Sequence, residues 1–156
     1  MKLMLAREAK IEDMKALQDL VLGMMDYHRS IDDGYKSAEG FGDLRVYIKA
    51  WLKDQNIKVF IAEEGGQIFG YLRASVNESP DYLNEPLYGM IDDVFVDQVN
   101  RRGGAAISLF EKAKEWFLKR GMSRVELNVH VKNPIAVALW KKLGFKDYKM
   151  RMKMDL

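Results

Sequence analysis

A short polar link between a strand-prone run and a helix-prone run carries the residues best suited to binding an anion. The link follows the apolar run at 94–96 and contains, in order, Arg101, Arg102, Gly103 and Gly104. Glycine lets the backbone turn tightly and approach a ligand closely. The first N–H groups of the following helix have no partner within it, and the helix dipole makes that end positive. The pattern predicts a pyrophosphate cradle, although two glycines before a helix are also common in an ordinary turn.

Two adjacent aspartates on the preceding run, Asp92 and Asp93, are candidates for proton transfer. Successive side chains of a strand point to opposite faces, so we expect only one of them to face a cleft, with Asp92 on the face of Val94 and Val96. We predict Asp92 as the general base, acting directly or through water. The ordinary aspartate pKa of about 3.9 is low for a base unless the carboxylate is desolvated. The alternative is that both aspartates form caps or salt bridges within the fold.

The two histidines give weaker indications. His28 ends a predicted helix among polar residues, and we expect it at the surface. His130 lies at the end of a predicted strand near the expected cleft, where either a proton relay or a buried, hydrogen-bonded histidine fits its position.

Two motifs stand in order in the second half of the chain. The first, Arg101-x-x-Gly104-x-Ala106, has the form Q/R-x-x-G-x-G/A and opens a helix directly after a strand. The second runs from Asn133-Pro134-Ile135-Ala136 to Trp140-Lys141-Lys142-Leu143-Gly144-Phe145 and follows the next strand. Together they resemble the acetyl-CoA-binding signature of the GNAT superfamily of N-acetyltransferases. The resemblance covers essentially the whole chain.

This resemblance implies a cosubstrate, a reaction and a set of contacts. The cosubstrate is acetyl-CoA, and an amine attacks its thioester directly, without a metal or a covalent enzyme intermediate. In this family two central strands splay apart, and the thioester enters the gap between them. The residues implied to contact acetyl-CoA are Val94, Phe95 and Val96 on the strand, Arg101, Arg102, Gly103, Gly104, Ala105 and Ala106 at the link, and Asn133 and Trp140 downstream.

Trp140 departs from the family pattern, which often has tyrosine here as the acid for the leaving thiolate. An indole N–H donates hydrogen bonds but does not ionise near neutral pH. We therefore expect Trp140 to pack against the pantetheine arm, and the general acid stays unassigned.

The elements that position these residues follow from hydrophobic spacing. Helices are predicted at 11–27, 43–53, 105–119 and 134–142, and strands at 3–7, 57–62, 68–76, 88–96, 125–131 and 145–156. The glycine pair at 65–66 predicts a hairpin turn. We predict an α/β (α+β) fold with a GNAT-like mixed, mostly antiparallel sheet, helices on both faces and a splayed central strand pair. One domain is expected over residues 1–156.

Composition excludes several classes of protein. The 156 residues are 48% hydrophobic and 31% charged and include no cysteine, which excludes disulfides, thiolate nucleophiles and cysteine-based zinc sites. No apolar run approaches the roughly 18 residues that a membrane span needs, and charge follows the first residues too soon for a signal peptide. We expect a cytoplasmic protein that does not bind a membrane.

Charge is unevenly distributed along the chain. Residues 1–97 carry 11 basic against 18 acidic side chains, a net charge of −7, whereas residues 98–156 carry 14 against 5, a net charge of +9. The basic half contains the predicted cofactor loop. The acidic half contains 26–43 and 78–85, the segments that shape the acceptor pocket in the resembling family. We therefore expect a cationic amine as the acceptor.

Other readings stay open. Trp140 also fits a non-catalytic module that binds acyl-CoA as a sensor or scaffold. A nucleic-acid binder is disfavoured because the basic residues are not interleaved with aromatic ones. The predicted strand at 145–156 leaves a homodimer open, with that strand exchanged or paired at an edge.

Overall fold

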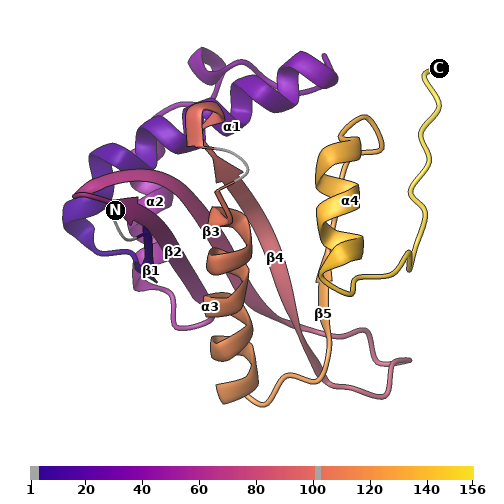
Figure 1. Ribbon diagram of the computed structural model, residues 1–156. Helices are drawn as coiled ribbons and strands as arrows, with labels where there is room; N and C mark the ends of the chain where they lie inside the picture. Colours follow the sequence, from indigo (N-terminus) through magenta and orange to yellow (C-terminus); the bar gives the residue numbers. More distant parts are fainter. Residues whose placement is uncertain (1–3, 101–102) are drawn as a thin grey trace.

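Five strands form a single sheet in the computed structural model of the chain, which describes residues 4–100 and 103–156. They lie in chain order: β1 (Met4–Glu8), β2 (Ile57–Glu64), β3 (Gln67–Glu78), β4 (Leu87–Val96) and β5 (Val125–Leu127). The first four are antiparallel, and β4 pairs with β5 in parallel. Figure 1 shows the sheet with helices on both sides. The predicted fold class is therefore confirmed.

The helices divide between the two faces of this sheet. On one face, α1 (Met14–Ile31) and α2 (Leu44–Lys53) pack over Val59, Ile61 and Tyr71. On the other, α3 (Ala105–Lys119) and α4 (Pro134–Lys142) pack over a second core that includes Leu72 and Ile91. Short 3-10 turns cover Ile11–Asp13, Ala38–Gly40 and Gln98–Asn100.

A two-residue alternation in β2 explains why both faces are covered. Val59 and Ile61 belong to the core under α1 and α2, whereas Phe60 and Ala62 belong to the core under α3. Successive strand residues point to opposite faces, so a continuous apolar run requires burial on both sides. The apolar run predicted as a strand at 57–62 therefore becomes an inner strand of the sheet.

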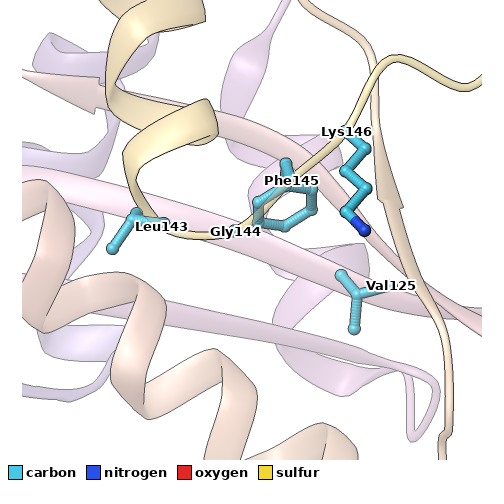
Figure 2. A pocket seen from close by; sticks show the side chains of 5 residues that line it. All are labelled: Val125, Leu143, Gly144, Phe145 and Lys146. Atoms are coloured by element: carbon cyan, nitrogen blue, oxygen red, sulfur yellow. The ribbon is translucent and has the colours of Figure 1, made fainter.

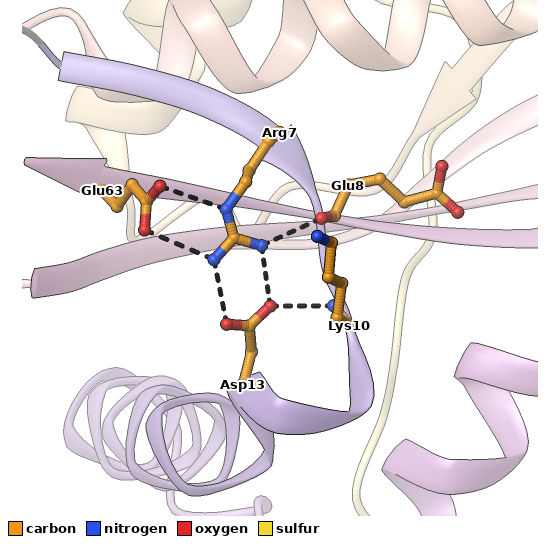
Figure 3. Close-up of polar contacts among 5 residues, drawn as sticks. All are labelled: Arg7, Glu8, Lys10, Asp13 and Glu63. Carbon is orange, nitrogen blue, oxygen red and sulfur yellow. Dashed lines mark hydrogen bonds and ion pairs between the residues drawn. The ribbon is translucent and has the colours of Figure 1, made fainter. Parts of the chain in front are cut away.

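A partly buried ion-pair cluster around Asp13 joins the first strand to the first helix (Figure 3). Both terminal nitrogens of Arg7 donate to the Asp13 carboxylate, at 2.9 and 3.0 Å, and Arg7 Nε donates to Glu63 Oε1 at 3.1 Å. Asp13 also accepts the backbone N–H of Lys10 at 2.8 Å. Residues 11–13 therefore form a 3-10 turn, and α1 begins three residues later than predicted and runs on to Ile31.

Two strand predictions in the last third of the chain were wrong. The strand predicted at 125–131 ends at Leu127, and residues 145–156 form no helix or strand. A strand needs a neighbour to satisfy its backbone N–H and C=O groups. Among the described residues, β5 has β4 as its one neighbour, so nothing in the chain extends the sheet beyond it. Of the helices in this described part, none is long and apolar enough to cross a membrane.

Candidate active site

The strands β4 and β5 part after a short parallel contact. Residues 89–91 pair with 125–127, and β4 then continues for five residues to Val96 while the chain after Leu127 leads to α4. Both α3 and α4 begin at this end of the sheet, as Figure 1 shows. The predicted splayed pair is thus present, and two helix N-termini lie beside it.

The α3 N-terminus is open to a ligand. Gly104 has φ +82°, a left-handed conformation that favours glycine, and a Cβ placed there would meet no atom within 4 Å among the described residues beyond its chain neighbours. The first helical hydrogen bond runs from Ser108 N–H to the Gly104 carbonyl at 3.0 Å, so the N–H groups of residues 105–107 have no partner within the helix. These features fit a pyrophosphate.

The other link residues contribute unequally. The Ala105 side chain is buried, so only its backbone faces the space before α3, whereas Ala106 is half-buried and Gly103 exposed. Arg101 and Arg102 lie outside the described residues.

The end of β4 is anchored on both faces. Val94 packs against the core under α3, and Phe95 packs against the core under α1. A Cβ on Gly23 of α1 would come within 2.9 Å of Phe95 Cε1, so glycine there permits the helix to lie close to this strand. Val96 is buried and pairs with Gly70 of β3. The strand edge predicted to meet pantetheine is therefore firmly positioned.

Asn133 and Trp140 both have structural partners. Asn133 Oδ1 accepts the Ala136 N–H at 3.2 Å and so caps α4. The Trp140 ring is 4% exposed, with edge-on contacts to Phe110 and Phe145 at centroid distances of 5.8 and 5.4 Å. Trp140 of α4 thus packs in the core between Phe110 of α3 and Phe145, which follows α4. The motif alone did not indicate this packing role.

A β-bulge alters the geometry of the paired aspartates. Arg73 pairs with Asp93 and Ala74 with Ile91, which leaves Asp92 as the extra residue. Asp92 interacts with Ser75, and Asp93 forms an ion pair with Arg73. Ser75 and Arg73 are two residues apart in β3, so their side chains lie on the same face of the sheet. The expectation that Asp92 shares its face with Val94 and Val96 was therefore wrong, because simple alternation fails at a bulge. Both carboxylates lie on the α1–α2 side.

The two carboxylates differ sharply in their electrostatic environment. Arg73 Nε donates to Asp93 Oδ2 at 2.8 Å, and the guanidinium lies 4.4 Å from the centroid of the Trp51 ring. Asp92 Oδ2 is buried and has no hydrogen-bond partner within residues 4–100 and 103–156. Burial raises the pKa of Asp92 above its ordinary value, even though the Ser75 hydroxyl and Arg73 act in the opposite direction. Asp93 is thus paired, and Asp92 is the carboxylate available to take a proton.

Two histidine contacts on this side could not be identified from the sequence. His28 is half-buried, stacks on Tyr35 with centroids 5.1 Å apart, and has a pKa lowered by this burial. His130 Nε2 lies 3.0 Å from Asp32 Oδ2, while His130 Nδ1 accepts the Lys132 N–H at 3.1 Å. Nδ1 is therefore unprotonated, and Nε2–H donates to Asp32. This bond joins residues 98 apart in sequence and links the end of α1 to the loop before α4.

The two acidic segments lie at different ends of the sheet. Segment 26–43 includes Asp32 and borders the diverging strands through its contact with His130. Segment 78–85 precedes β4 and therefore lies at the Leu87 end of that strand, whereas α3 begins beyond its Val96 end. Glu85 accepts a hydrogen bond from Arg124 Nη1 at 2.8 Å. The expectation that both segments flank one pocket was therefore wrong for 78–85.

A helix N-terminus beside two splayed strands of a mixed five-stranded sheet is the arrangement that the sequence resemblance implies. Residues 24–145 match the acetyltransferase (GNAT) family, and the chain belongs to that family. The predicted resemblance is confirmed.

Individual relatives agree with this assignment. An uncharacterized N-acetyltransferase of Methanocaldococcus jannaschii is 32% identical over 103 residues, which are 66% of this chain and 45% of the relative. The uncharacterized N-acetyltransferase YhfO of Bacillus subtilis is 26% identical over 146 residues, 90% of this chain and 89% of the relative. The chain thus spans less than half of the first relative's length. These names support the predicted class of enzyme, an N-acetyltransferase.

A solved structure shows the same fold. An aminoglycoside N-acetyltransferase, AAC(6')-Iy in complex with CoA, superposes with a TM-score of 0.78 at 16% identity, covering 100% of this chain and 96% of that one.

Proposed function

We propose that this protein transfers the acetyl group of acetyl-CoA to a primary amine. The observation that carries the proposal is the open, left-handed Gly104 at the N-terminus of α3, where β4 has parted from β5. The backbone N–H groups of residues 105–107 would hold the pyrophosphate, with Arg101 and Arg102 adding positive charge. The part of β4 at 94–96, beyond its pairing with β5, would hold the pantetheine arm, and Asn133 would complete the contacts predicted downstream.

Asp92 is proposed as the general base. An amine must lose a proton before or during attack on the thioester, and no described residue forms a competing hydrogen bond with the buried Asp92 Oδ2. Its raised pKa makes the carboxylate a better proton acceptor than an ordinary aspartate. The proton passes directly or through a water molecule. In the reaction, the amine nitrogen forms the new amide bond as the C–S bond of the thioester breaks.

The leaving thiolate needs no dedicated acid in this proposal. A free thiol has a pKa of about 8.5, so a thiolate can leave near neutral pH at a modest cost. The buried Trp140 ring fixes the end of α4 instead of donating a proton.

A cationic acceptor fits the acidic surface beside the site. The segment with Asp32 borders the diverging strands, and the half of the chain before residue 98 carries the net negative charge. The structural neighbour is named for aminoglycosides, which are polycationic amines. A small amine, a polyamine, or a lysine or N-terminal amine is the acceptor class.

Release of free thiol from acetyl-CoA across a panel of amines tests the proposal. The panel includes a monoamine, a linear polyamine, an aminoglycoside and a lysine peptide, and mass spectrometry identifies the acetylated product. We expect turnover with at least one cationic amine. Calorimetry with CoA runs in parallel, because tight CoA binding without turnover of any amine would favour the acyl-CoA sensor, the function that tryptophan at the acid position suggests.

A further inference from the structure

Arg73 of β3 lies between an aromatic ring and a carboxylate. Its Nε donates to Asp93 Oδ2 at 2.8 Å, and its guanidinium carbon lies 4.4 Å from the centroid of the Trp51 ring, which α2 contributes. The exposed fraction of the Arg73 side chain is 22%, and that of Asp93 is 15%. A guanidinium that stacks on a ring and bonds to a carboxylate is held in one orientation. Arg73 therefore provides a fixed positive charge on the α1–α2 side of the sheet.

The β-bulge brings two negative charges to this same side. Asp92 and Asp93 are adjacent in sequence, and in a regular strand their side chains would point to opposite faces. At the bulge, Asp92 interacts with Ser75 and Arg73, and Asp93 pairs with Arg73. Two carboxylates that share a site do not both ionise readily, so one of them holds a proton up to a higher pH. A protonated Asp92 would be unable to accept a proton from an amine.

Arg73 compensates the two carboxylates in different ways. Burial acts to lower the pKa of Arg73, but the charges of Asp93 and Asp92 raise it overall, so the guanidinium stays charged. Its hydrogen bond goes to Asp93. Burial raises the pKa of Asp92, whereas the Ser75 hydroxyl and the Arg73 charge act to lower it. Asp93 is therefore engaged by a direct bond, while Asp92 is kept closer to its ionised form and its Oδ2 has no partner among the described residues.

Other titratable groups around the aspartates come from α1, β3 and β5. Burial lowers the pKa of His28 of α1, and the Asp93 charge acts in the opposite direction. Burial raises the pKa of Tyr71 of β3, and Asp93 acts in the same direction, so this phenol stays neutral. Glu126 of β5 forms an ion pair with the arginine two residues before it, at 2.9 Å. Among the residues that the structure describes, the cation that acts on the pKa of the proposed base is Arg73.

A cavity on the other side of the sheet is separate from these groups (Figure 2). It measures about 340 Å³ and is lined by Val125, Leu143, Gly144, Phe145 and Lys146. The apolar side chains of this lining pack against the core under α3, so the cavity lies on the α3–α4 side. The sheet therefore separates the Lys146 ammonium from Asp92, and the Lys146 charge is not part of the balance at the bulge.

We infer that Arg73 is a positioning residue of the acetyl-transfer site, which binds Asp93 and so leaves Asp92 as the ionised proton acceptor. The inference rests on the proposed function, because Asp92 acts as a base only in that reaction. It gives unequal roles to two carboxylates that are identical in type and adjacent in sequence. Without the guanidinium, the two aspartates would share a proton up to a higher pH, and the base would be lost over that range.

Carbon NMR of the aspartate side-chain carboxyls, recorded against pH on the folded protein, tests this role without a substrate. The Asp92 signal is assigned by its loss in Asp92→Asn. In Arg73→Gln we expect Asp92 to titrate about one pH unit or more above its wild-type midpoint, because an opposite charge is removed. In Asp93→Asn it should titrate below the wild-type midpoint, because a like charge is removed. The combined variant Arg73→Gln/Asp93→Asn should lie between the two.

Arg7→Gln is the matched control for Arg73→Gln. Arg7 is also an ion-paired arginine on a strand, and its side chain is 28% exposed. It lies on β1, at the edge of the sheet away from β4 and β5. This variant should lose stability in urea denaturation, as Arg73→Gln should, but the titration of Asp92 should not change.

The pH dependence of kcat/KM for the acceptor connects the titration to catalysis. In each variant the acidic limb should move in the same direction as the Asp92 titration, while the high-pH plateau changes little. A purely structural role for Arg73 would lower the plateau and leave the limb in place, and that result would overturn the inference.

The NMR titration also separates this inference from the proposed function. An Asp92 midpoint that is unchanged or lower in folded Arg73→Gln, or an equal shift in Arg7→Gln, would overturn the role of Arg73. Where Arg73→Gln does not fold, an unchanged or raised midpoint in Asp93→Asn would do the same. Absence of turnover with any amine would instead reject the proposed function, and the titration would still decide whether Arg73 controls the ionisation of Asp92.

Discussion

Asp92 is buried, and its Oδ2 has no hydrogen-bond partner among the described residues. These two properties have opposite consequences for stability and for the proposed activity. The pKa of Asp92 is raised, so the folded state disfavours the charged carboxylate. The cost to stability is present above the folded pKa and disappears below the ordinary value of 3.8. Above that folded pKa the protein therefore keeps an unfavourable charge at the position where the proposed reaction needs a proton acceptor.

We expect Asp92→Asn to lower kcat/KM for the amine by roughly 10²–10⁴ while CoA affinity is unchanged. The amide keeps the shape of the side chain but cannot take a proton. The same change should leave the free energy of unfolding at neutral pH equal to or above that of the wild type, because the buried charge is removed. Steady-state kinetics and urea denaturation measure the two effects.

Asp93→Asn is the control for this prediction, since it removes an ion-paired carboxylate on the same face. It should lower the free energy of unfolding by about 2 kcal/mol, because Arg73 loses its charged partner. If Asp92→Asn behaved in the same way, with reduced stability and near-normal turnover, Asp92 would have a structural role only.

At the scale of elements, the left-handed turn into α3 is required by the proposed cradle rather than by packing. Among the described residues beyond its chain neighbours, no atom lies within 4 Å of a Cβ at Gly104, so packing does not account for a glycine there. We expect Gly104→Val to raise the Kd for CoA at least tenfold, about 1.4 kcal/mol, measured by calorimetry. The side chain would displace the backbone from the pyrophosphate.

Gly121, just beyond the other end of α3, provides a matched control. Its φ is +78°, and a Cβ there also meets no atom of the described part of the chain within 4 Å, its chain neighbours aside. Gly104→Val and Gly121→Val should each reduce stability by about 1–3 kcal/mol through backbone strain. Only the first should weaken CoA binding, and an equal loss of affinity in both would attribute the effect to stability.

The junction of β1 and α1 gives the fold a defined response to acid. Asp13 is 8% exposed, and the Arg7 guanidinium, with the Lys10 N–H, holds its pKa below the ordinary value of 3.8. The stabilisation is therefore present above the ordinary pKa and is lost as pH falls through the lower, folded value. We expect Asp13→Asn to reduce the free energy of unfolding by about 2–3 kcal/mol at pH 7 and by less near pH 3.

Asp19→Asn is the comparison for Asp13. Asp19 pairs with Lys15 on the exposed face of α1 at 3.0 Å. Exposed pairs of this kind contribute about 0–1 kcal/mol, so this variant should change stability little at either pH. Urea denaturation at both pH values measures all three proteins, and equal losses in the two variants would contradict the assigned importance of the cluster around Asp13.

Most helices and strands were predictable because their hydrophobic spacing matches what they bury. The helix at 105–119 was predicted with its observed bounds, since Phe110, Ala113 and Phe117 face the sheet and glycines flank both ends. The strand predictions at 128–131 and 145–156 were wrong. Alternating apolar residues show that a segment can form a strand, but a strand forms only where a neighbouring strand accepts its backbone hydrogen bonds. The sequence contains no information on whether that neighbour exists within one chain.

The site was predictable only where backbone geometry carries the chemistry. Gly104 was identifiable because few residues other than glycine adopt its φ. The side of Asp92 was not, because a bulge is a tertiary feature that shifts register by one residue. The contacts of His28 with Tyr35 and of His130 with Asp32 depend on which loops meet at the end of the sheet. The spacing of residues along the chain does not predict contacts between such distant loops.

At the scale of the whole molecule, the uneven charge should govern substrate preference. The net charge of −7 over residues 1–97 attracts a second positive charge on an acceptor, and salt screens this attraction over about 10 Å at 0.1 M. We expect kcat/KM for a diamine to exceed that for a monoamine of similar length. The ratio should fall toward one as the KCl concentration rises, as steady-state kinetics would measure.

The Kd for CoA provides an internal comparison, because the basic half of the chain carries the proposed anion site. We expect the Kd of the wild-type protein for CoA to rise with salt. The rise should be the same whichever amine is the acceptor, because this Kd is measured without an amine. A diamine preference that persists unchanged at high salt would mean that shape, rather than long-range charge, selects the acceptor.

The order of strands in the sheet also sets an order of assembly. β2, β3 and β4 pair with chain neighbours through a two-residue turn and one loop, whereas β5 reaches β4 only after α3 has crossed the sheet. Contacts that close long loops form late, and the β4–β5 contact involves only three residue pairs. We therefore expect the antiparallel pairs β2–β3 and β3–β4 to be formed in the folding transition state, and the parallel β4–β5 pair to form after it. During refolding, the base-bearing strand would then be in place before the strand that completes the proposed acetyl-CoA site.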